Sequence, residues 1–201
     1  MSLLSQTEPD KLIGLLRSEI GEIIQSWIVL NIYDYKAREL QTEDLLHDMQ
    51  NKNLQLLNLV RAKFRDDIIS RLSELSTSKH GRLNFGFAAD KFKIQKEEIK
   101  NFSDYLKEKH LVFRRNKNIA HKEISPTWNQ IDPHPVISKS VLLRAVGWAI
   151  SIMKQFDKVY YGENYRKLWE EERKRRYEME PAAPKYLLLP YIARIEMNEK
   201  K

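Results

Sequence analysis

The residues of this chain best suited to chemistry lie between Phe113 and Glu123. The segment reads Phe-Arg-Arg-Asn-Lys-Asn-Ile-Ala-His-Lys-Glu, so it combines four cations, two amides and one imidazole with a single acid. A histidine exchanges a proton near neutral pH, an arginine holds phosphate oxygens with its planar fork, and an asparagine orients a hydroxyl or a phosphate. These are the groups that cleavage of an RNA phosphodiester requires.

RNA cleavage by such groups needs no metal. An imidazole removes the proton of the ribose 2′-hydroxyl or protonates the leaving oxygen, while a guanidinium stabilises the charge that develops on the phosphate oxygens. The spacing of Arg115 and His121 alone says little in a chain with 5 His and 35 Lys and Arg residues. Asn116 directly after Arg115, Ala120 before His121 and the position after a predicted helix make the pattern more specific.

Helices must position this segment, because only 6 Gly and 7 Pro interrupt 201 residues. Such scarcity favours long helices joined by few loops. We therefore expect an all-α fold, an antiparallel helical bundle of about five helices with an extended C-terminal tail. A single domain should span residues 1–180. The tail, residues 181–201, should pack partly on the bundle or on a partner subunit, because it carries the apolar residues Leu187 to Ile192.

Apolar spacing predicts two long helices in the first half of the chain. Thr7 can cap the first helix, and its apolar stripe recurs every three or four residues: Leu12, Leu16, Ile20, Ile23, Trp27 and Leu30. A short helix should begin after Thr42, with this residue as its cap, and end near Asn51. The next long helix, ending at Ser76–Ser78, has its own stripe: Leu57, Val60, Phe64, Ile68, Leu72 and Leu75.

The second half of the chain should hold three further helices. Residues 81–86 are expected to form a loop, and a helix should lie within residues 94–111. Three prolines predict a loop over residues 125–137. Ser138 can cap a central core helix that ends at Gly162, and residues 163–180 should form a highly charged last helix. The central helix should bury one face: Val141, Ala145, Trp148, Ile152, Phe156 and Val159.

Composition narrows the class of partner. The formal net charge is +7 and the sequence pI is about 9.4, which favours encounter with polyanions, nucleic acid above all. Cysteine is absent, so no disulfide framework or thiolate metal site can form, and we expect a cytoplasmic protein. No apolar run has the length of a membrane-spanning helix, so no membrane partner is expected.

The segment Arg-Asn-Lys-Asn-Ile-Ala-His, residues 115–121, resembles the signature of HEPN domains, especially their abortive-infection branch. In that family an Arg, usually followed by a polar residue, precedes a His by four to six positions. The resemblance implies a helical bundle in which two protomers bring their signature segments together into one RNA-cleaving cleft. Some members carry a Tyr two residues after the His as a target for nucleotide addition. This chain has Glu123 there, so we do not expect that regulation.

The resemblance implies a metal-independent endoribonuclease that cleaves single-stranded RNA, in phage defence or in a toxin–antitoxin system. Arg115 and His121 would be catalytic with Asn116 in support, and no cofactor or metal would be needed. The expected partners are RNA, a second copy of the chain and a cognate antitoxin protein. The neighbouring residues expected to bind RNA are Arg114, Lys117, Lys122 and Trp128. The alternative is a catalytically inactive helical module that binds RNA or protein.

Simpler interpretations exist for each of these features. His121 can be a histidine packed between helices while Arg115 forms an ordinary ion pair. Trp128 can be a loop anchor rather than a base-stacking residue. The pair Asp66-Asp67 and the basic run of residues 173–176 are typical of solvated, ion-paired helix faces. The remaining histidines show no metal-ligand spacing: His47, His80, His110 and His134.

Overall fold

A computed structural model describes residues 9–42, 47–77, 83–116 and 137–179 of the chain. Within these ranges the chain is helical and contains no strand. The expected all-α fold is therefore confirmed. The elements are α1 (Pro9–Thr42), α2 (His47–Ser76), α3 (Phe85–Phe92), α4 (Glu97–Glu108), α5 (Leu111–Arg114), α6 (Lys139–Tyr161), a 3₁₀ turn (Gly162–Asn164) and α7 (Tyr165–Met179).

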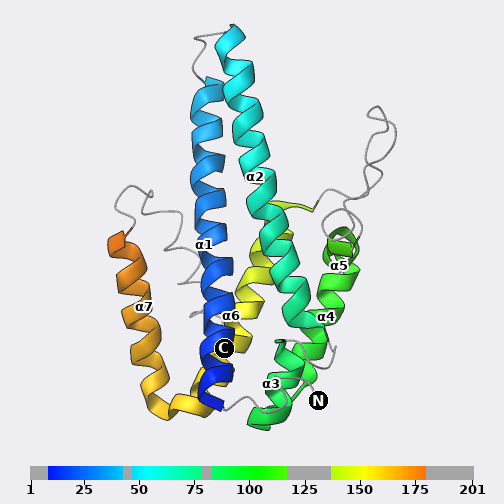
Figure 1. Cartoon of the computed structure of the whole chain (residues 1–201), viewed down its shortest axis with the longest axis vertical. Coiled ribbons are helices and arrows are strands. Elements are labelled where there is room, and N and C mark those ends of the chain that lie inside the picture. The colour runs from blue at the N-terminus through cyan, green and yellow to red at the C-terminus, as the bar shows by residue number, and fades with distance from the viewer. Residues whose placement is uncertain (1–8, 43–46, 78–82, 117–136, 180–201) are drawn as a thin grey trace.

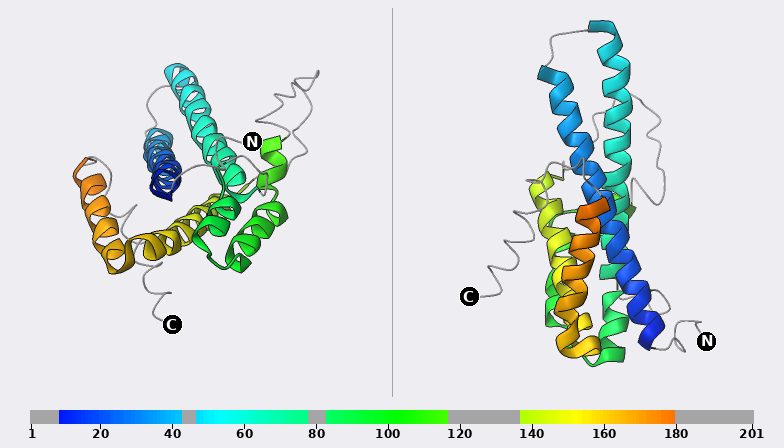
Figure 2. Two further views of the ribbon diagram at one scale, coloured as in Figure 1. Left: turned by 60° about the horizontal axis from the view of Figure 1, so that its bottom comes forward. Right: turned by 90° about the vertical axis from the view of Figure 1, so that its left-hand side faces the viewer.

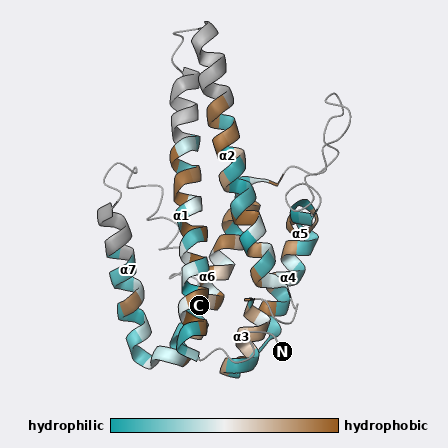
Figure 3. Ribbon diagram, in the orientation of Figure 1, coloured by the Kyte–Doolittle hydropathy of each residue, from teal (hydrophilic) through white to brown (hydrophobic). Residues whose placement is uncertain are grey.

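The helices form an antiparallel bundle. Helices α1 and α2 make a long antiparallel pair whose far ends extend beyond the other helices (Figures 1 and 2). Helix α6 packs against α1, α2, α3 and α4, and is thus the central helix that the sequence predicts. Helices α4 and α5 pack together against α2, while α7 packs on α6. Figure 3 shows that apolar residues run along α1, α2 and α6.

The predicted apolar stripes form the core. Every residue of the predicted α1 stripe is buried, as are the last three of the α2 stripe, Ile68, Leu72 and Leu75. Ser138 caps α6 by accepting a hydrogen bond from the Val141 amide, and Gly162 ends that helix with a positive φ of 58°. Only glycine adopts that conformation readily, so the predicted stop at Gly162 is confirmed.

Aromatic side chains hold α3, α4 and α6 together. Phe156 of α6 is fully buried, and its ring centroid lies 5.9 Å from that of Phe85 and 5.8 Å from that of Phe92. Phe102 of α4 meets Phe85 edge-on at 6.0 Å and also meets Trp148. Such ring pairs add to the free energy gained from burial alone. This cluster fixes the helices that lead toward the signature segment.

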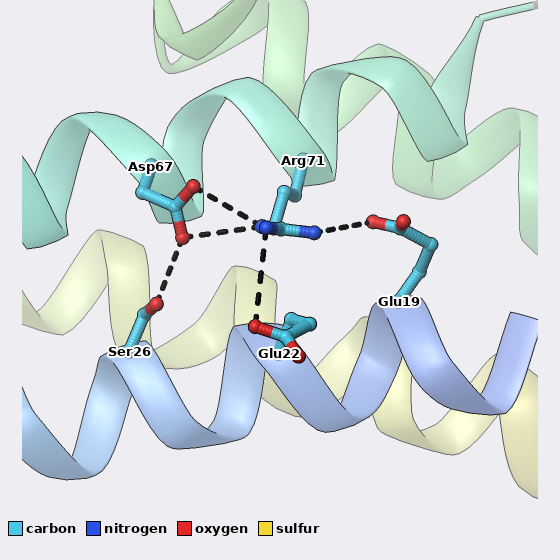
Figure 4. A network of polar contacts seen from close by, with 5 residues as sticks. All are labelled: Glu19, Glu22, Ser26, Asp67 and Arg71. Atoms are coloured by element: carbon cyan, nitrogen blue, oxygen red, sulfur yellow. Dashed lines mark hydrogen bonds and ion pairs between the residues drawn. The ribbon is translucent and has the colours of Figure 1, made fainter.

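A polar network fixes α1 against α2 (Figure 4). The Arg71 guanidinium donates to Glu19 at 2.8 Å and to both carboxylate oxygens of Asp67 at 3.1 Å. Asp67 also accepts a hydrogen bond from the buried Ser26 hydroxyl at 2.8 Å, and Glu22 lies 3.9 Å from Arg71. Asp67 thus belongs to an ion-paired face, as the sequence predicts.

A buried carboxylate joins α6 to α1 and α7. Asp157 of α6 is fully buried, accepts a hydrogen bond from the Trp169 indole at 2.8 Å and lies 3.4 Å from the Arg17 guanidinium. Burial raises the pKa of Asp157 from 3.8 to about 6, although Arg17 and the Trp169 hydrogen bond act in the opposite direction. The folded protein therefore binds a proton at Asp157 that the unfolded chain has lost.

Replacing Asp157 with asparagine should remove a pH dependence of stability. Between about pH 4 and pH 6 folding takes up a proton, so this group makes the free energy of unfolding fall as pH rises. A shift of about two units corresponds to about 3 kcal/mol over that window. Urea unfolding of the wild type and Asp157→Asn at pH 4 and pH 7.5 measures the difference. If the free energy of unfolding changed equally with pH in the two proteins, the raised pKa could not belong to Asp157.

The structure corrects the expected break between two helices near Asn51. Helix α2 is continuous from His47 to Ser76, and Thr42 is the last residue of α1 rather than the cap of a second helix. The reason is that residues 47–76 contain no glycine or proline. The polar residues at the start of this range therefore stay helical, because no glycine or proline interrupts them, even though apolar residues do not recur there at helical spacing.

Two further expectations are wrong. Residues 81–86 were expected to form a loop, but α3 begins at Phe85 because the buried Asn84 side chain accepts the Phe87 amide at 2.7 Å. Val159 was expected in the buried face of α6 but is 55% exposed, since no helix of the described residues buries it. The expected cap at Thr7 and the C-terminal tail lie outside the described residues.

Candidate functional site

The signature segment begins at the end of α5. His110 has a positive φ of 61° and turns the chain between α4 and α5, and the fully buried Leu111 anchors α5 against the bundle. Arg114 is the last residue of α5, and Arg115 and Asn116 follow in a wider π-helical turn. Turns of this kind occur frequently at functional sites. Helical structure therefore continues into the first two residues of the signature, Arg115 and Asn116, and the expected junction between helix and loop lies outside the described residues.

Arg115 lies against α2. Its Nη2 atom is 3.1 Å from the Glu74 carboxylate, and its Nη1 atom donates to the side-chain oxygen of Asn116 at 3.1 Å. The Arg115 side chain is only 18% exposed. Two groups thus orient the guanidinium, and one of them is the asparagine that follows Arg115 in the signature.

Arg114 faces a different part of α2. Its Nη2 atom lies 3.4 Å from Asp66, but its buried Nε atom has no hydrogen-bond partner among the described residues. Burial lowers the pKa of the neighbouring Arg65, and the charge of Arg114 adds to this effect. The side chains of Arg65 and Arg114 are therefore close enough to repel one another, and Arg114 Nε is a buried donor.

The same side of the bundle holds a second group of cations, around Asp34 of α1. Asp34 accepts from Arg61 Nε at 2.6 Å and from Lys139 Nζ at 2.7 Å. Burial raises the pKa of Asp34, but the hydrogen bonds and charges of Lys139 and Arg61 outweigh it, so the pKa lies below its ordinary value. Lys139 opens α6, so both ends of the undescribed segment 117–136 adjoin cationic groups.

Four of the predicted site residues lie outside the described residues, namely Lys117, His121, Lys122 and Trp128. His121 follows Asn116 by five positions, so its Cα lies within about 18 Å of that of Asn116. The described part of the site consists of Arg114, Arg115 and Asn116. The structure brings Arg114 and Arg115 together with two acids of α2, Asp66 and Glu74.

Several residues at this site have no counterpart in the sequence prediction. Glu74 lies 41 residues before Arg115, and Asp34 lies 105 residues before Lys139. Asp66 pairs with Arg114 of another helix and not only with cations of its own helix face. The one available signal was the four-residue spacing of Arg61 and Arg65, which puts both on a similar face of α2.

Among residues 9–42, 47–77, 83–116 and 137–179, no three His, Asp or Glu side chains gather as metal ligands. In the same ranges no helix combines the length and apolar character of a membrane span.

Comparisons with known proteins give no relative. The chain matches no protein-family model, no curated protein and no solved structure. The HEPN resemblance therefore rests on the sequence of residues 115–121 alone.

Proposed function

We propose that this chain is a metal-independent endoribonuclease of the HEPN type, which cleaves single-stranded RNA with Arg115 and His121. The observation that carries the proposal is the placement of Arg115. It lies at the end of a one-turn helix, is oriented by Asn116, and is followed by His121 six positions later. A guanidinium held in this way can receive a phosphate without first losing the freedom of a mobile side chain.

The proposed reaction is an internal phosphoryl transfer. The His121 imidazole takes the proton of the ribose 2′-hydroxyl, and the 2′-oxygen attacks phosphorus. The bond to the 5′-oxygen breaks and this oxygen takes up the proton from the His121 imidazolium, which leaves a 2′,3′-cyclic phosphate and a 5′-hydroxyl. Arg115 stabilises the charge on the non-bridging oxygens, and Asn116 holds the arginine. Arg114, Lys117 and Lys122 contact neighbouring phosphates, and Trp128 stacks on a base.

The biological setting of the proposal follows from the family resemblance. Two copies of the chain would join their Arg115 and His121 residues in one cleft, and a cognate antitoxin would restrain the nuclease in phage defence or in a toxin–antitoxin system. Light scattering at micromolar concentration measures the first of these points. A monomer would count against the shared cleft.

Wild-type protein should cleave labelled single-stranded RNA in the presence of a chelator. The product should end in a cyclic phosphate, because the 2′-hydroxyl is the nucleophile. A matched oligonucleotide with one 2′-deoxy residue at the mapped cleavage position should resist cleavage there and be cut elsewhere. Cleavage that stops with the chelator, or that ignores the 2′-deoxy substitution, would exclude this mechanism.

One observation favours the second candidate function, an inactive helical module that binds RNA or protein. The Arg115 guanidinium is already paired with Glu74 at 3.1 Å, as in an ordinary structural ion pair. In that case RNA would bind with an affinity that falls steeply as salt increases, but no product would form over long incubation. Absence of RNA binding at low salt would leave the protein-binding role.

A further inference from the structure

A groove lies between α1 and α7, well separated along the chain from Arg115. Its volume is about 420 Å³. Helix α1 contributes Gly14, Ser18 and Gly21, α6 contributes Met153, and α7 contributes Trp169. The groove thus combines small residues of α1 and the indole ring of α7 with the charged side chains of Arg17, Glu22 and Glu172.

The α1 wall is open where its side chains are smallest. A Cβ atom added at Gly14 would meet nothing within 4 Å, so no neighbouring helix of the described chain requires a glycine there. Glycine inside a helix costs about 0.5–1 kcal/mol relative to alanine. Close approach of another chain segment, one that lies in the groove, would account for glycine at this position.

Helix α7 is held mainly by α6. It packs on α6 and on the 3₁₀ turn, and Figure 2 shows it standing apart from α1. The link to α1 runs through Arg17, whose guanidinium lies 5.9 Å from the Trp169 ring centroid and 5.5 Å from that of Tyr161. Trp169 and Leu168 remain only partly buried. The inner face of α7 therefore has apolar surface available for a further segment.

We propose that the chain's own C-terminal residues 186–192 dock in the groove between α1 and α7. This segment reads Tyr-Leu-Leu-Leu-Pro-Tyr-Ile, the most apolar stretch of the chain after Met179. In an extended conformation its seven residues span about 20 Å. The α1 wall from Gly14 to Gln25 is about 17 Å long. The lengths of segment and groove therefore match.

Residues 180–185, which connect α7 to the segment, are long enough for the segment to return to the groove. The chain leaves α7 at Met179, and Glu172 lines the groove about 10 Å earlier along that helix. Residues 180–185 can reach up to about 20 Å, with Pro181 and Pro184 excluding continuation of the helix.

Charge and tethering favour this occupant over a separate partner. Lys185 and Arg194 flank the apolar run, while the groove is lined by the two acids Glu22 and Glu172 beside one cation, Arg17. A segment joined by six residues also has an effective concentration in the millimolar range, which a free peptide does not reach in solution.

Because the chain contains no cysteine, paired cysteines can test the docking directly. Ser18→Cys combined with Leu188→Cys should form an intramolecular disulfide in the full-length protein under mild oxidation. The control is Ser140→Cys with Leu188→Cys, because Ser140 is exposed and lies about 20 Å along α6 from Met153. Gel mobility gives the yield of the disulfide. Mass spectrometry of a mixture of isotope-labelled and unlabelled chains shows whether the disulfide forms within one chain or between two chains.

The expected yield for the Ser18 pair is at least five times that of the control pair. Adding Gly14→Leu to the Ser18 pair should lower the yield several-fold, because the leucine fills the groove while it suits a helix better than glycine does. Equal yields for the two pairs, disulfides only between chains, or a yield that ignores Gly14→Leu would each overturn the proposal.

Discussion

Replacing His121 with alanine should lower the rate of RNA cleavage at pH 7 by at least about 100-fold, since a positioned acid–base group contributes about 10² to 10⁴ in rate. The measurement is single-turnover cleavage of labelled RNA with chelator present. His134→Ala is the matched control, because His134 belongs to the same segment, residues 117–136, but not to the signature. Equal loss in both variants would show that the segment matters and His121 does not.

Arg115 should behave like His121 in the same assay. Arg115→Ala removes the group that stabilises phosphate charge, an effect worth about 10² to 10³ in rate for a single donor. Its ion pair with Glu74, whose side chain is 50% exposed, should contribute at most about 1 kcal/mol to stability, so the variant should stay folded. Arg144→Ala is the control, because Arg144 is exposed on α6 and lies over Tyr105. Full activity of Arg115→Ala would refute its role.

The sequence predicts helices well where their apolar faces repeat without interruption. The α1 stripe and the residues Ala145, Ile152 and Phe156 of the α6 face are buried as predicted, because both patterns repeat every three or four residues over several turns, while Trp148 is only partly buried. Helix α3 escaped prediction because it has only eight residues, contains Gly86 and depends on a cap from Asn84. The start of α2 was misplaced because its polar residues carry no periodic signal.

The candidate site was less accessible to sequence reasoning than the fold. The signature itself identified Arg115 and Asn116, which the structure places within hydrogen-bonding distance of each other. The acids that orient the cations could not be identified, because Glu74 and Asp66 lie on a helix whose rotation depends on packing rather than on local spacing. Periodicity predicts which face of α2 is buried but not which neighbour the remaining faces meet.

Phe156→Ala should cause the largest loss of stability of any variant considered. Phe156 is fully buried and contacts the rings of Phe85 and Phe92, so alanine leaves a cavity that joins α6 to α3. Removing a buried phenylalanine costs about 3–5 kcal/mol, a large part of the stability of an ordinary domain. Urea unfolding followed by far-ultraviolet circular dichroism should show a lower midpoint with an unchanged slope.

Val159→Ala provides the matched control on the same helix. Val159 follows Phe156 by three positions but is 55% exposed, so its truncation should change the free energy of unfolding by less than about 0.5 kcal/mol. The two variants together therefore show which face of α6 points into the core. If Val159→Ala lowered the free energy of unfolding as much as Phe156→Ala does, the buried face of α6 would extend to Val159, as the apolar spacing in the sequence suggests. A further segment or a partner would then have to cover that end of α6.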